Sequence, residues 1–276
     1  MATHKKQVVI FTDLDGKLLD AATYSWEAAR PALELISQRA IPFVLCSSKT
    51  RAEIEAYRKQ MDNHEPFVSE NGGGIFIPDA YFDFSFHFHK KVADYRVIEL
   101  GTPYARLRES LQILAKKSGA NVRGYGEMSA SEIAAQTGLS IEEAQMAKQR
   151  EYDEPFVISG SDEQIKRALQ LIRPMGLSWT KGSRYYHLIG ANDKGKAVKI
   201  LIDLFKQKLR SVITIGLGDS PNDLPMLKAV DYPILVQKAG GQYEDSIQIN
   251  NLIKAEGIGP EGWKKAIFRL LASCAD

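Results

Sequence analysis

The sequence alternates short, continuous apolar runs with longer segments that have the apolar periodicity of helices. A run at 8–11 is followed by a helical segment at 26–39, a second run at 41–46 and a further helix from Thr50 onward. Continuous apolar runs of this length are typical of strands that are buried on both faces. Such strands, alternating with helices, predict a parallel sheet with helices on both faces and a ligand site at the carboxyl ends of the strands.

The regular alternation stops after a glycine-rich segment. A short strand at 66–69, the turn Asn71-Gly72-Gly73-Gly74 and an apolar run at 75–77 predict a hairpin. Beyond the hairpin, strands and helices no longer alternate one to one: we expect strands at 84–89, 96–100 and 155–159, and helices at 103–117, 129–148 and 161–173. This irregular order favours a smaller α+β domain inserted into the first.

The alternation returns near residue 190. The expected elements are a helix at 193–208, a strand at 212–215, a strand at 232–236 and a helix at 260–271. We therefore expect an α/β fold with a Rossmann-like, doubly wound parallel sheet as its core. Residues 1–83 and 190–276 form this core, and residues 84–189 form the inserted α+β domain.

Acidic residues stand where two of the expected strands end. Asp13 and Asp15 directly follow the first strand, and Asp219 follows the strand at 212–215. A carboxylate can attack phosphorus when a divalent cation neutralises the charge between the two anions, and a second carboxylate can transfer protons. Magnesium prefers a few carboxylates, water and phosphate oxygens. Asp13, the main-chain carbonyl of Asp15 and the carboxylate of Asp219 are therefore the predicted ligands of a Mg²⁺ cofactor.

Three further residues suit a phosphate group. Ser47 and Ser48 follow the second strand and precede a helix, where hydroxyl and amide groups are available to a phosphate. Lys194 begins the helix after the insertion, and its ammonium can neutralise a carboxylate or a phosphate. Taken singly, Ser47 could be a helix cap and Lys194 a solvated side chain. Their joint occurrence with the acidic motifs, at the ends or starts of neighbouring elements, favours phosphoryl transfer.

The composition argues against several other classes of function. The chain has 36 basic and 34 acidic residues and a formal charge of +2, so it offers no general reason to expect a nucleic-acid or membrane-surface partner. We find neither an apolar run of membrane-spanning length nor a signal-peptide pattern in the sequence. Its two cysteines, Cys46 and Cys274, show no metal-ligand or disulfide spacing. We expect a cytoplasmic protein, and the sequence does not indicate its oligomeric state.

At these residues the chain resembles the haloacid dehalogenase (HAD) superfamily. The four motifs of that superfamily match Asp13-Leu14-Asp15-Gly16, Ser47, Lys194 and the segment 218–223. The insertion between the second and third motifs resembles the α/β cap of a subgroup that includes many sugar-phosphate phosphatases. The resemblance implies Asp13 as nucleophile, Asp15 as general acid and base, catalytic roles for Ser47 and Lys194, and magnesium held by Asp13, Asp15 and Asp219.

A narrower resemblance is to the mannosyl-3-phosphoglycerate phosphatase family, in the segments 69–74, 124–128, 147–154 and 184–187. It implies a small phosphorylated sugar-glycerate substrate and the release of phosphate and mannosylglycerate, a compatible solute. Glucosyl-3-phosphoglycerate or another sugar phosphate is the nearest alternative substrate. A phosphomutase and a non-catalytic sugar-phosphate sensor are the alternative functions.

Five residues are candidates for binding this substrate. Arg150 and Arg184 suit its carboxylate, because a guanidinium binds a carboxylate in bidentate fashion. A surface ion pair with its acidic neighbours is the alternative for Arg150. Asn71, beside Gly72, either presents its amide to the substrate or shapes the glycine turn. Ser48 and Gly72 complete the set.

Lys17 is a departure from the superfamily pattern, which usually has threonine or valine at this position. Its side chain either approaches the site and perturbs Asp15, or points into solvent. We expect it to point into solvent.

Overall fold

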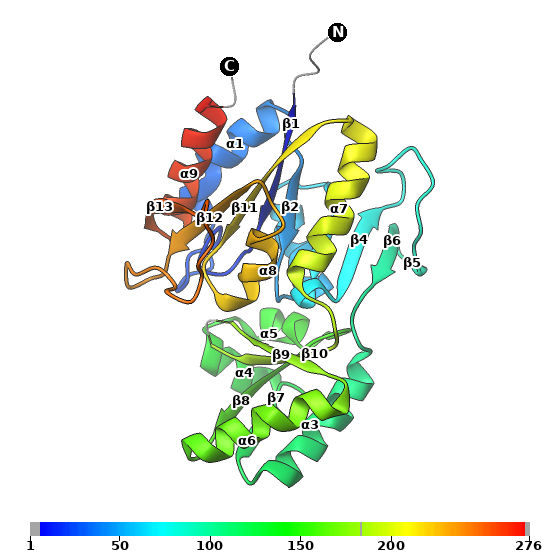
Figure 1. Ribbon diagram of the computed structural model, residues 1–276, viewed down its shortest axis with the longest axis vertical. Coiled ribbons are helices and arrows are strands. Elements are labelled where there is room, and N and C mark those ends of the chain that lie inside the picture. The colour runs from blue at the N-terminus through cyan, green and yellow to red at the C-terminus, as the bar shows by residue number, and fades with distance from the viewer. Residues whose placement is uncertain (1–5, 183, 274–276) are drawn as a thin grey trace.

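A sheet of nine strands and a separate sheet of four strands organise the described part of the computed structural model, residues 6–182 and 184–273; Cys274 lies outside it. The large sheet forms the upper part of the molecule in Figure 1, and the small sheet forms the lower part. In spatial order, the large sheet consists of β13 (Ile253–Ile258), β12 (Tyr232–Gln237), β11 (Val212–Gly218), β1 (Gln7–Thr12), β2 (Phe43–Cys46), β3 (Phe67–Ser69), β4 (Gly74–Pro78), β6 (Tyr95–Glu99) and β5 (Lys90–Val92).

Helices cover both faces of the large sheet and enclose two hydrophobic cores (Figure 1). Fully buried side chains of β1 alternate between them, with Ile10 in one core and Val9 and Phe11 in the other. A strand buried on both faces must be apolar throughout, which explains the continuous run in the sequence. The first core is covered by α1 (Arg30–Gln38), α2 (Arg51–Gln60) and α9 (Gly259–Ser273), and the second by α7 (Lys194–Leu209) and α8 (Leu224–Leu227). The predicted doubly wound α/β core is confirmed.

The order of the strands brings distant segments to one edge of the sheet. The strands from β13 to β3 are parallel, and β4, β6 and β5 continue the sheet in antiparallel pairs. Thr12, the last residue of β1, lies level with Leu217 of β11 on one side and Leu45 of β2 on the other. The segments that follow these three strands therefore meet at the carboxyl edge of the sheet.

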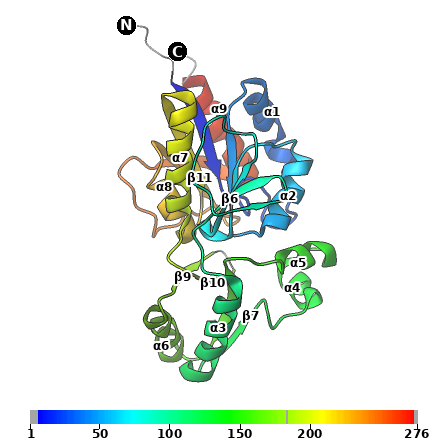
Figure 2. The same cartoon turned by 90° about the vertical axis from the view of Figure 1, so that its right-hand side faces the viewer.

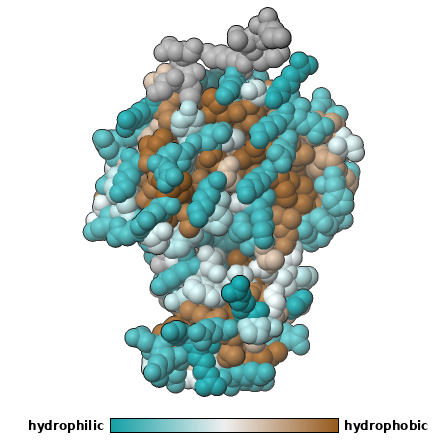
Figure 3. Space-filling view, in the orientation of Figure 1, coloured by the Kyte–Doolittle hydropathy of each residue, from teal (hydrophilic) through white to brown (hydrophobic). Residues whose placement is uncertain are grey.

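The small antiparallel sheet has helices of its own. Its strands are β7 (Asn121–Gly124), β8 (Glu154–Ser159), β10 (Tyr186–Ile189) and β9 (Ser178–Lys181). Its helices are α3 (Tyr104–Ser118), α6 (Asp162–Ile172), α4 (Ala130–Thr137) and α5 (Ile141–Ala147). Figure 2 shows α4 and α5 next to the upper part, and Figure 3 shows the molecule narrowing between the two parts. Across the described ranges, none of the helices has the length and apolar character needed to span a membrane.

The predicted start of the insertion near residue 84 is wrong, as is the strand predicted at 84–89. Strands β5 and β6 extend the large sheet, because β6 pairs with β4, and the chain leaves this sheet after Glu99. The alternating aromatic residues that suggested a strand instead pack on the second core, where Phe82 contacts Phe205 of α7. An extended segment places every second side chain on one face, so these aromatic residues can pack on the core although the structure describes no strand for this segment.

Other elements also differ from their predictions, and strands β5, β7, β9 and β10 are not among those expected. The helix expected at 129–148 is divided at Gly138, which has φ +81° and ends α4, after which Ser140 caps the start of α5. Strand β13 is not apparent in the sequence, because Lys254, Glu256 and Gly257 interrupt its apolar pattern. It lies at the edge of the large sheet, where polar side chains are tolerated.

Candidate active site

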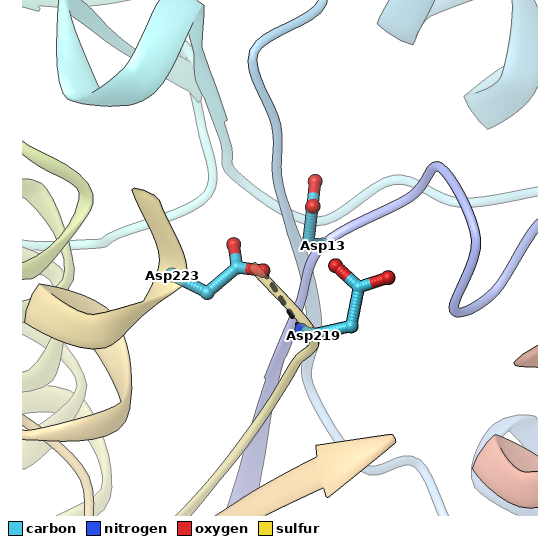
Figure 4. Close-up of side chains that lie close together, drawn as sticks. All are labelled: Asp13, Asp219 and Asp223. Atoms are coloured by element: carbon cyan, nitrogen blue, oxygen red, sulfur yellow. Dashed lines mark hydrogen bonds between the residues drawn. The ribbon is translucent and has the colours of Figure 1, made fainter. Parts of the chain in front are cut away.

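Three carboxylates converge at the carboxyl ends of β1 and β11. Asp13 follows β1, Asp219 follows β11, and Asp223 ends the short 3-10 helix Pro221–Asp223 (Figure 4). All three residues are buried, and one oxygen from each lies within 4.8 Å of the others. The main-chain N–H of Asp219 donates to the Asp223 carboxylate at 2.9 Å, which holds the loop in place. A buried set of oxygen donors of this kind suits a hard divalent cation such as Mg²⁺.

Asp223 is the member of this cluster that sequence reasoning misses. Its signal is its position four residues after Asp219, in the first turn of the helical segment that follows the strand end. One helical turn after Asp219, the Asp223 carboxylate again lies near the end of β11, where it accepts a hydrogen bond from the Asp219 N–H. The carboxylate of Asp15, in contrast, lies outside the cluster, and its main-chain carbonyl stays a predicted ligand.

Lys194 lies between two of the carboxylates, as a neutralising ammonium should. Its Nζ atom is 3.0 Å from Asp13 Oδ1 and 2.6 Å from Asp223 Oδ1, and the residue is 1% exposed. It is the first residue of α7, whose N-terminus packs closely on the turn at Gly72. A Cβ atom on Gly72 would lie 2.2 Å from the main-chain oxygen of Asp193, so glycine is required for this approach.

Lys17 does not point into solvent, and this prediction is wrong. The residue is 2% exposed, and its Nζ atom lies 2.5 Å from Asp13 Oδ2 and 2.8 Å from Asp219 Oδ1. The fully buried Leu18 that follows it, together with the hydrogen bond from Lys17 N–H to the Leu14 carbonyl, anchors the backbone beside the carboxylates. Burial alone would lower the pKa of Lys17, but the charges of Asp13, Asp219 and Asp223 outweigh that effect and raise the pKa well above its ordinary value.

The two ammonium groups control the ionisation of Asp13. Burial alone would raise the pKa of this carboxyl, but Lys17 and Lys194 outweigh the effect and hold the pKa well below its ordinary range. Asp223 is shifted in the opposite direction, because burial and the charge of Asp13 raise its pKa. Asp13 is therefore an ionised carboxylate at neutral pH, as a nucleophile must be.

Asp15 has a different environment from Asp13. Its side chain is about one-third exposed, and its Oδ1 atom lies 3.1 Å from Nζ of Lys49. Lys49 is 5% exposed and also pairs with Glu53 at 3.4 Å. Sequence reasoning did not select Lys49, although it stands next to the predicted Ser48. A partly exposed carboxylate beside an ammonium, outside the carboxylate cluster, is suitably placed to exchange protons with a substrate.

A cavity of about 360 Å³ opens over these residues, between the two parts of the molecule. As far as the described residues define its wall, the lining includes six of the predicted site residues, Asp13, Asp15, Ser48, Arg150, Arg184 and Asp219, together with His187 of β10. Ser47 is fully buried behind this wall, where its N–H donates to the Val68 carbonyl at 3.0 Å.

The two predicted arginines differ in burial. The side chain of Arg150 is 5% exposed and lies 3.8 Å from the buried Glu53 carboxylate, so its ion pair is not a surface one. It donates to the carbonyls of Ser48 and Ala147, both at 2.7 Å. Arg184 is exposed at the cavity wall and donates to the Thr137 carbonyl at 2.6 Å. Arg150 thereby links the part of the molecule built on the small sheet to the loop after β2. Arg184, being exposed, has further guanidinium N–H groups that can donate to a ligand in the cavity.

Asn71 has its side chain engaged in a buried network. Its amide donates to Asp153 at 2.6 Å, and its oxygen accepts a hydrogen bond from Asn222 at 3.0 Å. Asp153 in turn contacts Nδ1 of His187, a residue of the cavity wall, at 2.9 Å. With φ at 55°, Asn71 also forms the turn itself. Of the two interpretations of Asn71, the structure favours the shaping of the turn.

Glu70 should make stability depend on pH. Burial raises its pKa to about 8 from an ordinary value of 4.5, against the lowering effect of Arg150 and of the N–H groups of Glu151 and Tyr152. Between these pH values the folded state holds a proton that the unfolded state has lost, so the free energy of unfolding should fall as pH rises from about 4.5 to about 8.

Denaturant unfolding at several pH values checks this prediction. Glu70→Gln should flatten the profile across that window, whereas Glu109→Gln, on the exposed face of α3, should leave it unchanged. A Glu70→Gln profile parallel to that of the wild type would contradict the assignment.

The fold and the site together define the class of this protein. It belongs to the haloacid dehalogenase-like hydrolase family, whose model matches residues 10–244. A Methanococcoides burtonii protein named glucosyl-3-phosphoglycerate/mannosyl-3-phosphoglycerate phosphatase is 49% identical, with the match covering 95% of this chain and 97% of that protein. A Persephonella marina protein of the same name is 40% identical, with corresponding coverages of 96% and 97%. A crystal structure of a Thermoplasma acidophilum protein, at 15% identity, matches with a TM-score of 0.68 and covers 97% of this chain and 99% of its own, which supports the fold.

Proposed function

We propose that this protein is a magnesium-dependent phosphatase that converts mannosyl-3-phosphoglycerate to mannosylglycerate and phosphate through a phosphoaspartate on Asp13. The observation that carries the proposal is an ionised, buried Asp13 at the wall of a cavity, between the ammonium groups of Lys17 and Lys194. The names of two extensive matches supply the class of substrate. Because both names include the glucosyl compound, we propose it as a second substrate.

The proposed reaction has two steps. Asp13 attacks the phosphorus atom, the bond from phosphorus to the glycerate oxygen breaks, and Asp15 donates a proton to that oxygen. Asp15 then takes a proton from a water molecule that attacks the phosphoaspartate, which releases phosphate and restores both carboxyl groups. Lys194 holds Asp13 in place and offsets negative charge near it in both steps.

The carboxylate cluster is the proposed site of Mg²⁺. Asp13, Asp219 and the main-chain carbonyl of Asp15 are the proposed ligands, and Asp223 supports the site by bonding the Asp219 loop. When bound, the ion offsets the charge that would otherwise repel a phosphate from Asp13. The oxygen-only donor set of the cluster supports this assignment.

The unit built on the small sheet is the proposed specificity cap. It contributes Arg150, Arg184 and His187 to the wall of the cavity, opposite the catalytic carboxylates. Two guanidinium groups and an imidazole suit a substrate that has hydroxyl groups and a carboxylate in addition to its phosphate.

Phosphate release from mannosyl-3-phosphoglycerate, with and without Mg²⁺, tests the proposed function. We expect release that depends on the ion, with a comparable rate on glucosyl-3-phosphoglycerate and lower rates on simple sugar phosphates. Isomerised sugar phosphate without net phosphate release would instead identify a phosphomutase. Equal, low rates on every substrate would refute the specific assignment.

Arg184→Ala should raise KM for mannosyl-3-phosphoglycerate by about 10- to 100-fold, the usual effect of losing a charge-assisted hydrogen bond. Because Arg184 is exposed, the free energy of unfolding should change little. Steady-state kinetics measure the effect, with Arg173→Ala, an exposed arginine of the same unit beyond the cavity wall, as the matched control. An unchanged KM would remove Arg184 from the substrate site.

A further inference from the structure

The side chain of Lys17 ends among the three carboxylates that form the proposed metal site. Its ammonium contacts Asp13 and Asp219 and lies 3.7 Å from Oδ2 of Asp223. These are the same three residues whose oxygens lie close enough to hold an ion. The ammonium thus contacts two of the proposed ligands and approaches the residue that supports them.

The local backbone directs Lys17 into this position. Gly16, with φ +78°, turns the chain directly after Asp15, and its N–H donates to the Leu19 carbonyl at 2.9 Å. Leu18 and Leu19 are fully buried, so the loop is anchored immediately beyond Lys17. Lys17 stands four residues after Asp13, beyond the turn at Gly16. Its side chain therefore folds back and contacts the Asp13 carboxylate.

An ammonium and a divalent ion cannot share these oxygens at low cost. Metal–oxygen distances for Mg²⁺ are about 2.0–2.1 Å. An ion bound to Oδ1 of Asp219 would therefore lie no more than about 5 Å from the Lys17 ammonium, which is 2.8 Å from the same atom. Like charges at this separation repel strongly in a buried site, where water does not screen them.

Formal charges favour an exchange of one cation for the other. Three carboxylates face two ammonium groups, Lys17 and Lys194, which leaves one negative charge. A divalent ion in place of the Lys17 ammonium would bring the cluster to neutrality. The cavity that Lys17 also lines offers space for the displaced side chain.

We infer that Lys17 is a tethered cation that competes with the divalent ion for Asp13 and Asp219, so that each ion bound displaces the lysine side chain from the cluster. The inference rests on the proposed function for its catalytic consequence, a raised Mg²⁺ requirement. Binding itself is independent of turnover. Other members of the superfamily usually have threonine or valine at this position, and neither side chain carries a charge that could compete with a metal ion. In this chain Lys17 supplies that charge.

Calorimetric titration with Mg²⁺ and with Mn²⁺, in the absence of substrate, tests the competition. Lys17→Thr should lower the Kd of both ions at least tenfold relative to the wild type. Lys238→Thr is the matched control, because Lys238 also lines the cavity but pairs with Glu244 and not with the carboxylate cluster. This control should keep the wild-type Kd.

A second measurement uses the unaltered protein, in case Lys17→Thr does not fold. Reductive methylation followed by mass spectrometry should label Lys17 slowly without metal and several-fold faster in saturating Mg²⁺, while the exposed Lys199 is labelled equally in both. Equal Kd values for wild type and Lys17→Thr, or unchanged Lys17 labelling while calorimetry shows binding, would overturn the inference. A failure of the proposed function would appear separately, as absent phosphate release with the competition intact.

Discussion

Replacing Asp13 with asparagine should lower phosphate release by at least about a thousandfold, because the amide cannot form the phosphoaspartate. The fold should be retained, since the substitution is nearly isosteric. It also leaves two carboxylates, Asp219 and Asp223, facing the two ammonium groups of Lys17 and Lys194. The variant therefore creates no excess of buried negative charge.

Single-turnover kinetics with mannosyl-3-phosphoglycerate and denaturant unfolding measure the two parts of this prediction. The control is Asp203→Asn, which makes the same chemical change at an exposed position of α7 and should leave both quantities unchanged. Turnover of Asp13→Asn within tenfold of the wild type would refute Asp13 as the nucleophile. Loss of activity together with loss of folding would leave its role as nucleophile unsupported.

Replacing Lys194 with methionine should have the largest effect on stability. Lys194 is 1% exposed and pairs with both Asp13 and Asp223, so its removal leaves three buried carboxylates facing one ammonium. Breaking a buried ion pair from one side commonly costs about 3–5 kcal/mol, because the remaining charges are neither hydrated nor paired. We expect the free energy of unfolding at neutral pH to fall by about this amount.

Urea unfolding monitored by circular dichroism measures this loss. Lys199→Met, an exposed position on the same helix, is the matched control and should change the free energy of unfolding by less than about 0.5 kcal/mol. Acidification should reduce the difference between Lys194→Met and the wild type, because protonated carboxyl groups no longer need the ammonium. A loss as small as that of the control would show that Lys194 does not neutralise the cluster.

The sequence determined the core of the fold and the edge of the sheet that carries the site. The apolar run of β1 is continuous because both of its faces are buried, and a change to polar residues at Asp13 marks its end. The same change occurs after β2 and after β11. The carboxyl ends of parallel strands lie at one edge, so these local patterns were sufficient to bring Asp13 and Asp219 together.

The position of each charged side chain within that edge was decided by the tertiary structure. The residues next to Lys17 in the sequence are compatible with either a solvated or a buried side chain. The structure buries it against Asp219, which lies 202 residues away in the chain. Asp223 likewise pairs with Lys194, and Asn71 accepts a hydrogen bond from Asn222, so their roles depend on residues that the folded sheet brings close. Strands β5 and β6 extend the large sheet because β6 pairs with the edge of β4. Local periodicity reports which faces of an element are buried. It does not report which charges share a buried site, because that free energy depends on distances between segments far apart in the sequence.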